Sequence, residues 1–369
     1  MTRLSRAPAN LKPNAGFASR VVHWQREHGR HGLPWQNTRD PYRVWLSEIM
    51  LQQTQVSTVL GYYGRFLQRF PDVQSLAAAS LDDVFGLWSG LGYYSRARNL
   101  HRCAESVVSQ HGGVFPSGSE VLQTLPGIGR STAAAIAAFC FGERVAILDG
   151  NVKRVLTRVL GFDGDLAEAA QQRELWAQAT RLLPESGIEP YTQGLMDLGA
   201  TLCLARSPQC LLCPVREDCV AAREGRPERY PVKTRKLKRG QREHLWLWLR
   251  WRDQVWLVQR PATGVWAGLW SLPEFDTAAA FETASAAWPG QAEPLPSFTH
   301  TLTHLDWTLH PLRWTLPART SAKRVTAITT PWLVGRWSNL DEALTLGLPA
   351  PLRKLLVTGQ EPVPARLQS

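Results

Sequence analysis

Apolar residues recur at spacings of three and four through the first 230 positions, and later they alternate with polar residues. The first pattern gives a helix one apolar face, and the second gives a strand one apolar face. The sequence therefore predicts a helical region followed by a region that contains β-structure. The predicted helices span residues 17–29, 43–57, 58–70, 80–88, 94–111, 119–124, 131–141, 151–160, 170–183 and 189–203.

The pattern changes after residue 243. The segment HLWLWLRW alternates, RDQ suits a turn, and VWLVQRP alternates again, which predicts a β-hairpin. The basic segment before it has no apolar periodicity and is interpreted as a linker. The predicted organisation is a flexible tail (1–16), an all-α domain (17–230), a linker (231–243), a second domain (244–358) and a tail (359–369).

The chain has 369 residues, which is enough for two domains of ordinary size. Its 42 Lys and Arg outnumber 31 Asp and Glu, giving a net charge of +11 that favours a polyanionic partner such as nucleic acid. The sequence contains no run of about 18 apolar residues, so it predicts no membrane span. The N-terminal segment has no apolar core behind its positive charges, so it does not read as a secretory signal.

The stretch Leu125–Leu156 combines a glycine turn, a helix of small residues and an isolated carboxylate. Gly127 and Gly129 can take backbone angles that other residues avoid, and they let an outside group approach closely. The helix that follows points its free N–H groups at this turn, which suits a phosphate. Asp149 comes after an apolar run. The alternative is a helical hairpin in which Asp149 only caps the next helix.

A second candidate acid, Glu48, lies in the segment WLSEIMLQQTQV. The pattern places it between Trp45 and Ile49, with Gln52 one turn later on the same helical face. A carboxyl among apolar neighbours has a raised pKa and can hold a proton at neutral pH, as a general acid must. The amides that follow can pair with base edges. The alternative is a solvated helix face.

The segment GLGYYSRARNL carries Tyr93 and Tyr94 after another glycine turn. Exposed aromatic rings beside Arg96 and Arg98 could enter a base stack while the arginines hold phosphates. Composition alone favours the alternative, in which both tyrosines belong to a core.

Four of the six cysteines fall within 17 positions, which is typical of metal ligation in a reducing cytoplasm. Their irregular spacing suits an iron–sulfur cluster, with a tetrahedral zinc site as the rival because one CxxC is present. Basic neighbours suggest a structural site that shapes a loop near phosphates. These four cysteines are Cys203, Cys210, Cys213 and Cys219.

Taken together, these motifs resemble a known family. LPGIGRS resembles the helix-hairpin-helix of the endonuclease III superfamily of DNA glycosylases, LDGNV its aspartate segment, and the cysteine spacing its [4Fe–4S] loop. WLSEIMLQQTQV and GLGYYSRARNL resemble the adenine glycosylase (MutY) branch, which removes adenine mispaired with 8-oxoguanine. The resemblance covers residues 20–230.

The resemblance implies roles for individual residues. Glu48 matches the acid that protonates adenine, and Asp149 matches the carboxylate that stabilises the sugar cation. Gln193 falls at a position that contacts adenine, while Gln53 and Tyr93 match residues inserted beside the opposing 8-oxoguanine. The remaining implied contacts are Gln52 and Ser131 for substrate and Gly127, Gly129 and Arg130 for the DNA backbone.

One position separates two branches of the superfamily. Glycosylases that also cut the strand carry a lysine nucleophile directly after the hairpin, where this chain has Ser131. A serine cannot form a Schiff base, so the resemblance implies a monofunctional enzyme. Lys153 lies four residues beyond Asp149 and could give weak incidental trapping of the abasic product.

The segment TGVWAGLWSLPEF resembles the Nudix-like C-terminal domain of this family, without the glutamates that hold magnesium in a true Nudix box. The implied fold is an all-α helix-hairpin-helix domain with an iron–sulfur loop, followed by an α+β Nudix-like domain that binds rather than hydrolyses. FTHTLTHLDW resembles the loop that reads 8-oxoguanine, usually F-S-H, with Leu302, Thr303 and His304 in its place.

The implied partner is double-stranded DNA holding A:8-oxoguanine or A:G mispairs, bound by a cytoplasmic, nucleoid-associated monomer with a [4Fe–4S] cluster. One rival is a pyrimidine-lesion glycosylase of the same fold, against which Ser131 and the C-terminal domain argue. The other rival is a non-catalytic DNA-binding protein, against which Glu48 and Asp149 argue together.

Overall fold

The computed structural model describes residues 16–234, 238–332 and 334–359. Most of both predicted tails and the middle of the predicted linker lie outside these residues. The chain divides into two compact units, and each is built from two separate segments. The first unit comprises residues 1–53 and 106–236, and the second comprises residues 54–105 and 237–369, so the helices between 54 and 105 group with the C-terminal region.

The helices of the first part of the chain agree with the predicted ranges to within about two residues, apart from the join between the second and third. They are α1 (Phe17–His28), α2 (Pro41–Leu51), α3 (Val56–Arg69), α4 (Val73–Ala77), α5 (Leu81–Trp88), α6 (Ser95–His111), α7 (Ser119–Leu122), α8 (Arg130–Phe141), α9 (Gly150–Leu160), α10 (Ala169–Arg181), α11 (Ile188–Thr201) and α12 (Val220–Arg223). Two of these, α4 and α12, were not predicted.

The predicted helix 43–57 is wrong at its C-terminal end. Helix α2 ends at Leu51, and a polar loop follows, because Gln52 takes an extended ψ of 110° and Gln53 a left-handed φ of 57°. Neither conformation continues an α-helix. Gln52 therefore lies beyond the helix and not on its face, and the amides of this segment stand in a loop.

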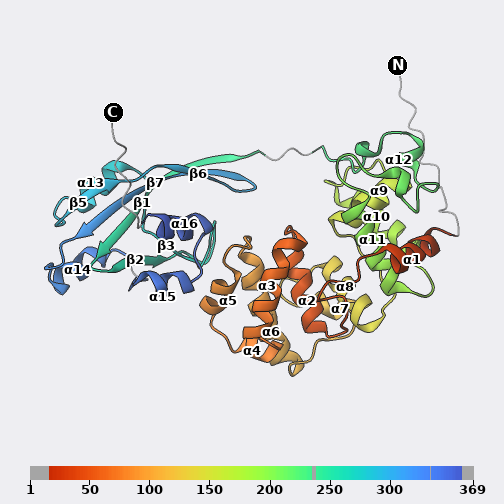
Figure 1. Ribbon diagram of the computed structural model, residues 1–369, viewed down its shortest axis with the longest axis horizontal. Coiled ribbons are helices and arrows are strands. Elements are labelled where there is room, and N and C mark those ends of the chain that lie inside the picture. The colour runs from red at the N-terminus through yellow and green to blue at the C-terminus, as the bar shows by residue number, and fades with distance from the viewer. Residues whose placement is uncertain (1–15, 235–237, 333, 360–369) are drawn as a thin grey trace, which may run out of the picture. The chain divides into compact units, whose positions relative to one another are not determined.

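The first unit is organised around α8, α9 and α11. Helix α1 packs on α11 although the two lie far apart in the sequence, α9 also packs on α11, and α2 packs on α8. The core between them is apolar and includes Val152, Leu156 and Leu198, all fully buried. This packing fixes the helix starts that carry the candidate site (Figure 1).

The second unit contains an eight-stranded mixed sheet. Its central path runs β3-β2-β1-β7-β5, with β4 paired to β1, β6 to β7 and β8 to β2. The predicted hairpin is confirmed, since β1 and β2 pair antiparallel with Trp251 opposite Gln254. The strands are β1 (Gly240–Trp251), β2 (Gln254–Gln259), β3 (Trp270–Ser271), β4 (Glu274–Phe275), β5 (Gln291–Pro294), β6 (Phe298–Thr301), β7 (Leu305–Leu316) and β8 (Gly335–Ser338).

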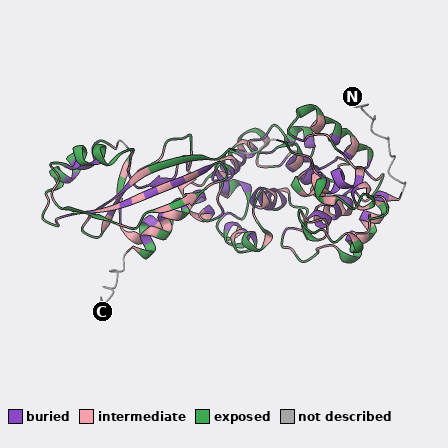
Figure 2. Cartoon of the chain, turned by 90° about the horizontal axis from the view of Figure 1, so that it is seen from above, coloured by how far each residue is buried: buried purple, intermediate pink, exposed green. Residues whose placement is uncertain are grey.

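The longest pairing in this sheet is parallel. Strand β1 lies beside β7 in register along all of its length, from Gly240 opposite Leu305 to Trp251 opposite Leu316. Buried positions run along the middle of the long strands (Figure 2). Helices complete the unit, and they are α13 (Ala278–Ser285), α14 (Ala322–Thr329), α15 (Leu340–Thr345) and α16 (Ala350–Thr358).

Candidate active site

Glu48 lies on α2, a helix that begins where Asp40 accepts a hydrogen bond from the backbone N–H of Tyr42 at 3.0 Å. Its neighbours Trp45 and Ile49 are buried, as the sequence predicted. Burial, and after it the nearby Asp149 carboxylate, raises the pKa of Glu48 from 4.5 to about 8. The side chain stays partly accessible. It therefore holds a proton at neutral pH where a ligand can reach it.

Asp149 is the N-cap of α9, and its Oδ1 accepts the backbone N–H of Val152 at 2.7 Å. Burial raises the pKa of Asp149, while the N–H groups of Val152 and Asn151 and the cations Arg154 and Lys153 oppose that shift. Asp149 therefore caps α9, as the alternative interpretation expected. A cap does not exclude chemistry, because the same donors that cap the helix stabilise the ionised carboxylate.

The fold brings these two acids together across 101 positions of sequence. Helix α2 packs on α8, and α8 leads through an apolar segment to the start of α9. The Asp149 carboxylate is close enough to raise the pKa of Glu48. One carboxyl is therefore set to be neutral, while the other is surrounded by donors that favour its charge. Such a difference between two neighbouring acids is the usual basis for dividing acid and anion roles.

The glycine turn precedes α8 as predicted. Gly127 has a φ of 77°, which only glycine adopts without strain, whereas Gly129 has an ordinary φ of –83°. Helix α8 starts at Arg130 with no side chain capping its free N–H groups. The guanidinium of Arg130 lies over the ring of Trp176 at 4.0 Å. The start of α8 thus exposes unpaired donors to an outside anion.

Ser131 occupies the first turn of α8. Its Oγ is buried and has no hydrogen-bond partner among the residues that the structure describes. In the loop after α2, the Nε2 of Gln52 donates to the Oγ1 of Thr132 at 3.4 Å, and Gln53 takes its left-handed conformation. The polar loop and the glycine turn therefore meet at the start of α8.

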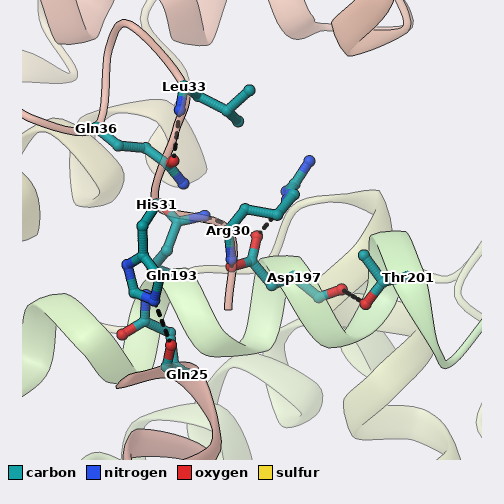
Figure 3. A network of polar contacts seen from close by, with 8 residues as sticks. All are labelled: Gln25, Arg30, His31, Leu33, Gln36, Gln193, Asp197 and Thr201. Atoms are coloured by element: carbon teal, nitrogen blue, oxygen red, sulfur yellow. Dashed lines mark hydrogen bonds and ion pairs between the residues drawn. The ribbon is translucent and has the colours of Figure 1, made fainter. Parts of the chain in front are cut away.

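Gln193 lies on α11, and its Nε2 donates to Oδ1 of Asp197 at 2.9 Å (Figure 3). Asp197 is fully buried and is also paired with Arg30, whose Nε donates at 2.6 Å and whose backbone N–H donates at 2.9 Å. The sequence analysis missed Arg30 and Asp197. The i, i+4 spacing of Gln193 and Asp197 was the available signal.

Gln36 is a further polar residue that sequence reasoning missed. Its Oε1 accepts the backbone N–H of Leu33 at 3.1 Å (Figure 3). Its Nε2 is buried and has no partner within the described part of the chain. An unpaired buried donor costs free energy, so Gln36 is a candidate to donate to a ligand.

In the second unit, the two consecutive tyrosines differ. Tyr94 is buried, as the core interpretation predicted, whereas Tyr93 keeps 45% of its surface exposed and has a left-handed φ of 48°. The hydroxyl of Tyr93 shares a 3.0 Å hydrogen bond with Oγ1 of Thr303. A residue expected in an aromatic wedge thus contacts a residue expected in the 8-oxoguanine loop.

Residues 302–304 form the turn between β6 and β7. The backbone N–H of Leu302 donates to the carbonyl of Leu305 at 2.7 Å, and the carbonyl of His304 accepts from Gly240 at 2.9 Å. The side chains of Thr303 and His304 are exposed. The turn therefore holds its backbone in place and leaves both side chains accessible.

The four clustered cysteines line one pocket of the first unit. Cys213 lies within electrostatic range of the other three, and the buried Arg158 donates to the sulfur of Cys203 at 3.2 Å. Within the described residues, no group of three or more His, Cys, Asp or Glu side chains is arranged to hold a metal ion. Four thiols around one pocket match the donor set of an iron–sulfur cluster. Cys103 and Cys140 lie elsewhere, on α6 and α8.

Residues 46–179 match the HhH-GPD superfamily of base excision DNA repair proteins, and residues 245–358 match the NUDIX domain. The chain is 34% identical over 352 residues to the adenine DNA glycosylase of Buchnera aphidicola subsp. Acyrthosiphon pisum (strain APS), covering 92% of this chain and 96% of that protein. It is 31% identical over 417 residues to the adenine DNA glycosylase of Homo sapiens, covering 94% and 74%.

Among solved structures, a thermostable thymine-DNA glycosylase gives a TM-score of 0.51 at 27% identity, over 56% of this chain and 95% of that one. These matches confirm the predicted fold class, a helix-hairpin-helix glycosylase domain followed by a Nudix-like domain. None of the helices in the described ranges is both long and apolar enough to cross a membrane.

Proposed function

The chain belongs to the adenine DNA glycosylase family of base excision repair, enzymes that hydrolyse N-glycosidic bonds, and from this premise we propose that it removes adenine paired with 8-oxoguanine or guanine. The single observation that supports this most is the pair Glu48 and Asp149, two neighbouring carboxyls whose pKa values are both raised by burial, with hydrogen-bond donors and cations opposing that rise only at Asp149. This pair argues against a non-catalytic DNA-binding protein.

In the proposed reaction, the bond between adenine N9 and the sugar C1′ breaks as Glu48 gives its proton to adenine N7. Adenine then leaves neutral, and the sugar carbon becomes cationic. The Asp149 carboxylate stabilises that positive charge, which is the largest type of catalytic contribution. A water molecule completes the hydrolysis and its second proton returns to the ionised Glu48. The target base must first leave the stack.

The proposed recognition of adenine depends on the orientation of Gln193. An ionised Asp197 can only accept, so the amide of Gln193 must direct one N–H toward it. That leaves the Gln193 carbonyl oxygen and its second N–H for a base edge. The unpaired Nε2 of Gln36 supplies a further donor. Gln52, whose Nε2 donates to Thr132 in the first turn of α8, is also proposed to contact the substrate.

We propose that the enzyme is monofunctional. Ser131 replaces the lysine that a strand-cutting glycosylase carries after the hairpin, and its hydroxyl is buried. Lys153 is near enough to Asp149 to oppose the rise in its pKa, so it is the candidate amine near the proposed chemistry. Incidental trapping of the abasic product would involve Lys153.

For the opposite strand, the proposed readers are Gln53, Tyr93, Thr303 and His304. 8-Oxoguanine differs from guanine by an oxygen at C8 and a hydrogen at N7. The hydroxyls of Tyr93 and Thr303 both donate and accept, and they are already hydrogen-bonded to each other. The turn at Gly127 and Gly129 and the start of α8 at Arg130 would bind DNA phosphates. We expect one chain to act alone.

The residues proposed to hold a [4Fe–4S] cluster are Cys203, Cys210, Cys213 and Cys219. When bound, the cluster supplies iron–thiolate bonds that fix the shape of the loop. Arg158 binds the carbonyls of Leu204, Ala205 and Tyr230 as well as the Cys203 sulfur, which orients this loop from the protein side. No step of base release passes through the cluster.

This cofactor assignment has a direct test. Cys213→Ser should remove most of the absorbance at about 400 nm that gives the protein a brown colour, and most of the bound iron. The reason is that a cubane cluster needs all four thiolates. Cys103→Ser is the matched control and should leave both unchanged. Metal analysis that finds stoichiometric zinc and no iron in the unaltered protein would overturn the assignment in favour of a zinc site.

The proposed function is tested with three duplexes that carry A opposite 8-oxoguanine, A opposite G, or thymine glycol. Release of free adenine from the first two, and of nothing from the third, is the expected result. Borohydride should trap at most a faint covalent adduct. A strong adduct that disappears in Ser131→Ala, or release of thymine glycol alone, would contradict the proposal.

A further inference from the structure

Tyr93 and Tyr94 are adjacent in the chain but do different things. Tyr94 keeps only 7% of its surface exposed, and its ring packs edge-on against Phe85 at 5.8 Å. Tyr93 is exposed and carries a left-handed backbone that is unfavourable for a residue with a side chain. A conformation of this kind persists only when the surroundings hold it.

The turn between α5 and α6, residues 89–94, is bound at both ends by the C-terminal region. The hydroxyl of Tyr94 donates to the carbonyl of Leu348 at 2.8 Å. At the other end, the Nε of Arg353 donates to Oγ of Ser89 at 3.0 Å. We call these two hydrogen bonds the tyrosine anchor. The anchor joins parts of the chain that lie more than 250 positions apart within one compact unit.

The backbones around the tyrosine anchor approach too closely for side chains to intervene. A Cβ at Gly86 would lie 2.3 Å from the carbonyl oxygen of Thr345, and a Cβ at Gly347 would lie 2.4 Å from the Cβ of Phe85. Phe85 and Leu348 are fully buried. This contact is therefore packed like a protein interior and is not a loose surface encounter.

A second set of contacts lies beside the first. The Nε1 of Trp270 donates to Asp82 at 3.1 Å, and the guanidinium of Arg98 donates to the carbonyl of Ala267. The neighbouring Trp266 stacks on Trp307 at 4.8 Å. Trp307 stands on β7 just after the turn that carries Thr303. Helices α5 and α6 thus contact the C-terminal region both at the tyrosine anchor and beside the tryptophans that pack near the start of β7, which follows the turn that carries Thr303.

We propose that Tyr94 is a positioning residue for lesion recognition: through the tyrosine anchor it holds Tyr93 against Thr303, so that the two hydroxyls form one preassembled reading site before DNA arrives. This rests on the proposed function, because it names how that function distinguishes 8-oxoguanine from guanine. Preassembly matters because ordering a flexible turn during binding would consume part of the interaction free energy. Adenine release itself uses Glu48 and Asp149 and does not need the tyrosine anchor.

The test is Tyr94→Phe, which removes one hydroxyl and keeps the ring that packs on Phe85. Tyr62→Phe is the matched control. The hydroxyl of Tyr62 also donates to a backbone carbonyl at 2.8 Å, that of Ser89, so this variant removes one bond to the same turn and leaves both bonds of the tyrosine anchor in place. Tyr94→Phe should lower the single-turnover preference for A:8-oxoguanine over A:G about fivefold, the equivalent of one hydrogen bond, with the A:G rate unchanged. Tyr62→Phe should keep the preference.

A second readout does not depend on the substrate. In the DNA-free protein, hydrogen exchange of residues 340–349 should be faster in Tyr94→Phe than in the unaltered chain and in Tyr62→Phe. Unchanged exchange there, an unchanged preference, or equal loss of preference in both variants would overturn the proposal. If the unaltered protein releases no adenine from either duplex, the proposed function fails, and the exchange readout still decides whether the tyrosine anchor exists.

Discussion

The two acids and the 302–304 turn are surrounded in opposite ways. Glu48 and Asp149 lie where burial raises the pKa of each carboxyl. Thr303 and His304 are exposed on a strand turn, and Thr303 makes its contact with an exposed tyrosine. Desolvated charges can change a reaction barrier greatly, whereas exposed neutral hydroxyls change affinity by small amounts. Catalysis and selectivity should therefore be separable by substitution.

Glu48→Gln should have the largest effect, because an amide has no proton to give to the leaving base. The single-turnover rate of adenine release should fall by roughly 10²–10⁴, the usual contribution of a general acid. Binding of the mispaired duplex should remain. Glu120→Gln, an exposed glutamate of α7, serves as the control and should react normally. Release at the unaltered rate by Glu48→Gln would remove Glu48 from the mechanism.

Asp149→Asn should follow, with a loss of about 10²–10³ in the same rate, because charge disappears opposite the developing cation while shape is kept. The helix cap confounds this result, so a cap of the same kind is the control. Asp72 caps α4 by accepting the backbone N–H of Ser75 at 2.7 Å, the same distance that Asp149 shows. Asp72→Asn should leave the rate intact, and an equal loss there would reduce Asp149 to a structural cap.

The pH dependence separates the two acids without mutating either one. Glu48 acts protonated, and its pKa is raised to about 8. The rate should therefore be level through neutral pH and should fall about tenfold per unit as pH rises beyond about 8. Asp149 acts ionised, so the rate should also fall at low pH, where this carboxylate becomes protonated. That fall should occur above the usual pH range of aspartate titration, because burial raises the pKa of Asp149. A basic limb that persists in the residual activity of Glu48→Gln would contradict this assignment.

The smallest effect is expected on the recognition side. Thr303→Val keeps the shape of the side chain and removes the hydroxyl that bonds Tyr93. The preference for 8-oxoguanine over guanine should fall by about 1 kcal/mol, roughly fivefold, while A:G turnover stays the same. Thr299→Val is the control on β6, since Thr299 shares a comparable 3.1 Å bond with Thr308. Equal losses in both would point to hairpin stability and not to lesion reading.

Local signals in the sequence were enough to predict most helices, the β1–β2 hairpin, the buried neighbours of Glu48 and the helix start at Asp149. The end of α2 was missed because residues 52–57 contain no glycine or proline to mark a break, while the break depends on the backbone angles of Gln52 and Gln53. The short helix α4 was missed although Asp72 and Ser75 form a capping box, because five residues carry little periodicity.

The remaining features depend on contacts between distant segments, which periodicity does not encode. The parallel pairing of β1 with β7 joins residues about 65 positions apart. The ion pair of Arg30 with Asp197 spans 167 positions, and the bond of Tyr94 to Leu348 spans 254. Asp197 falls within the predicted helix 189–203 and Tyr94 was assigned to a core by the alternative interpretation, but sequence patterns did not indicate which residues they contact.

The glycine-lined contact between α5 and the segment after α15 has a consequence for biosynthesis. Phe85 is covered by Gly347 and its neighbours, which emerge from the ribosome long after Phe85. At about 5–20 residues per second, the 254 positions between Tyr94 and Leu348 take roughly 13–50 s to translate. Throughout that interval α3 and Tyr94 can already pack on α5, but the face of α5 that contacts Gly347 lacks this partner. The nascent chain should therefore expose that apolar face until residues 345–348 have emerged, and a chain without these residues should be less soluble than the full chain.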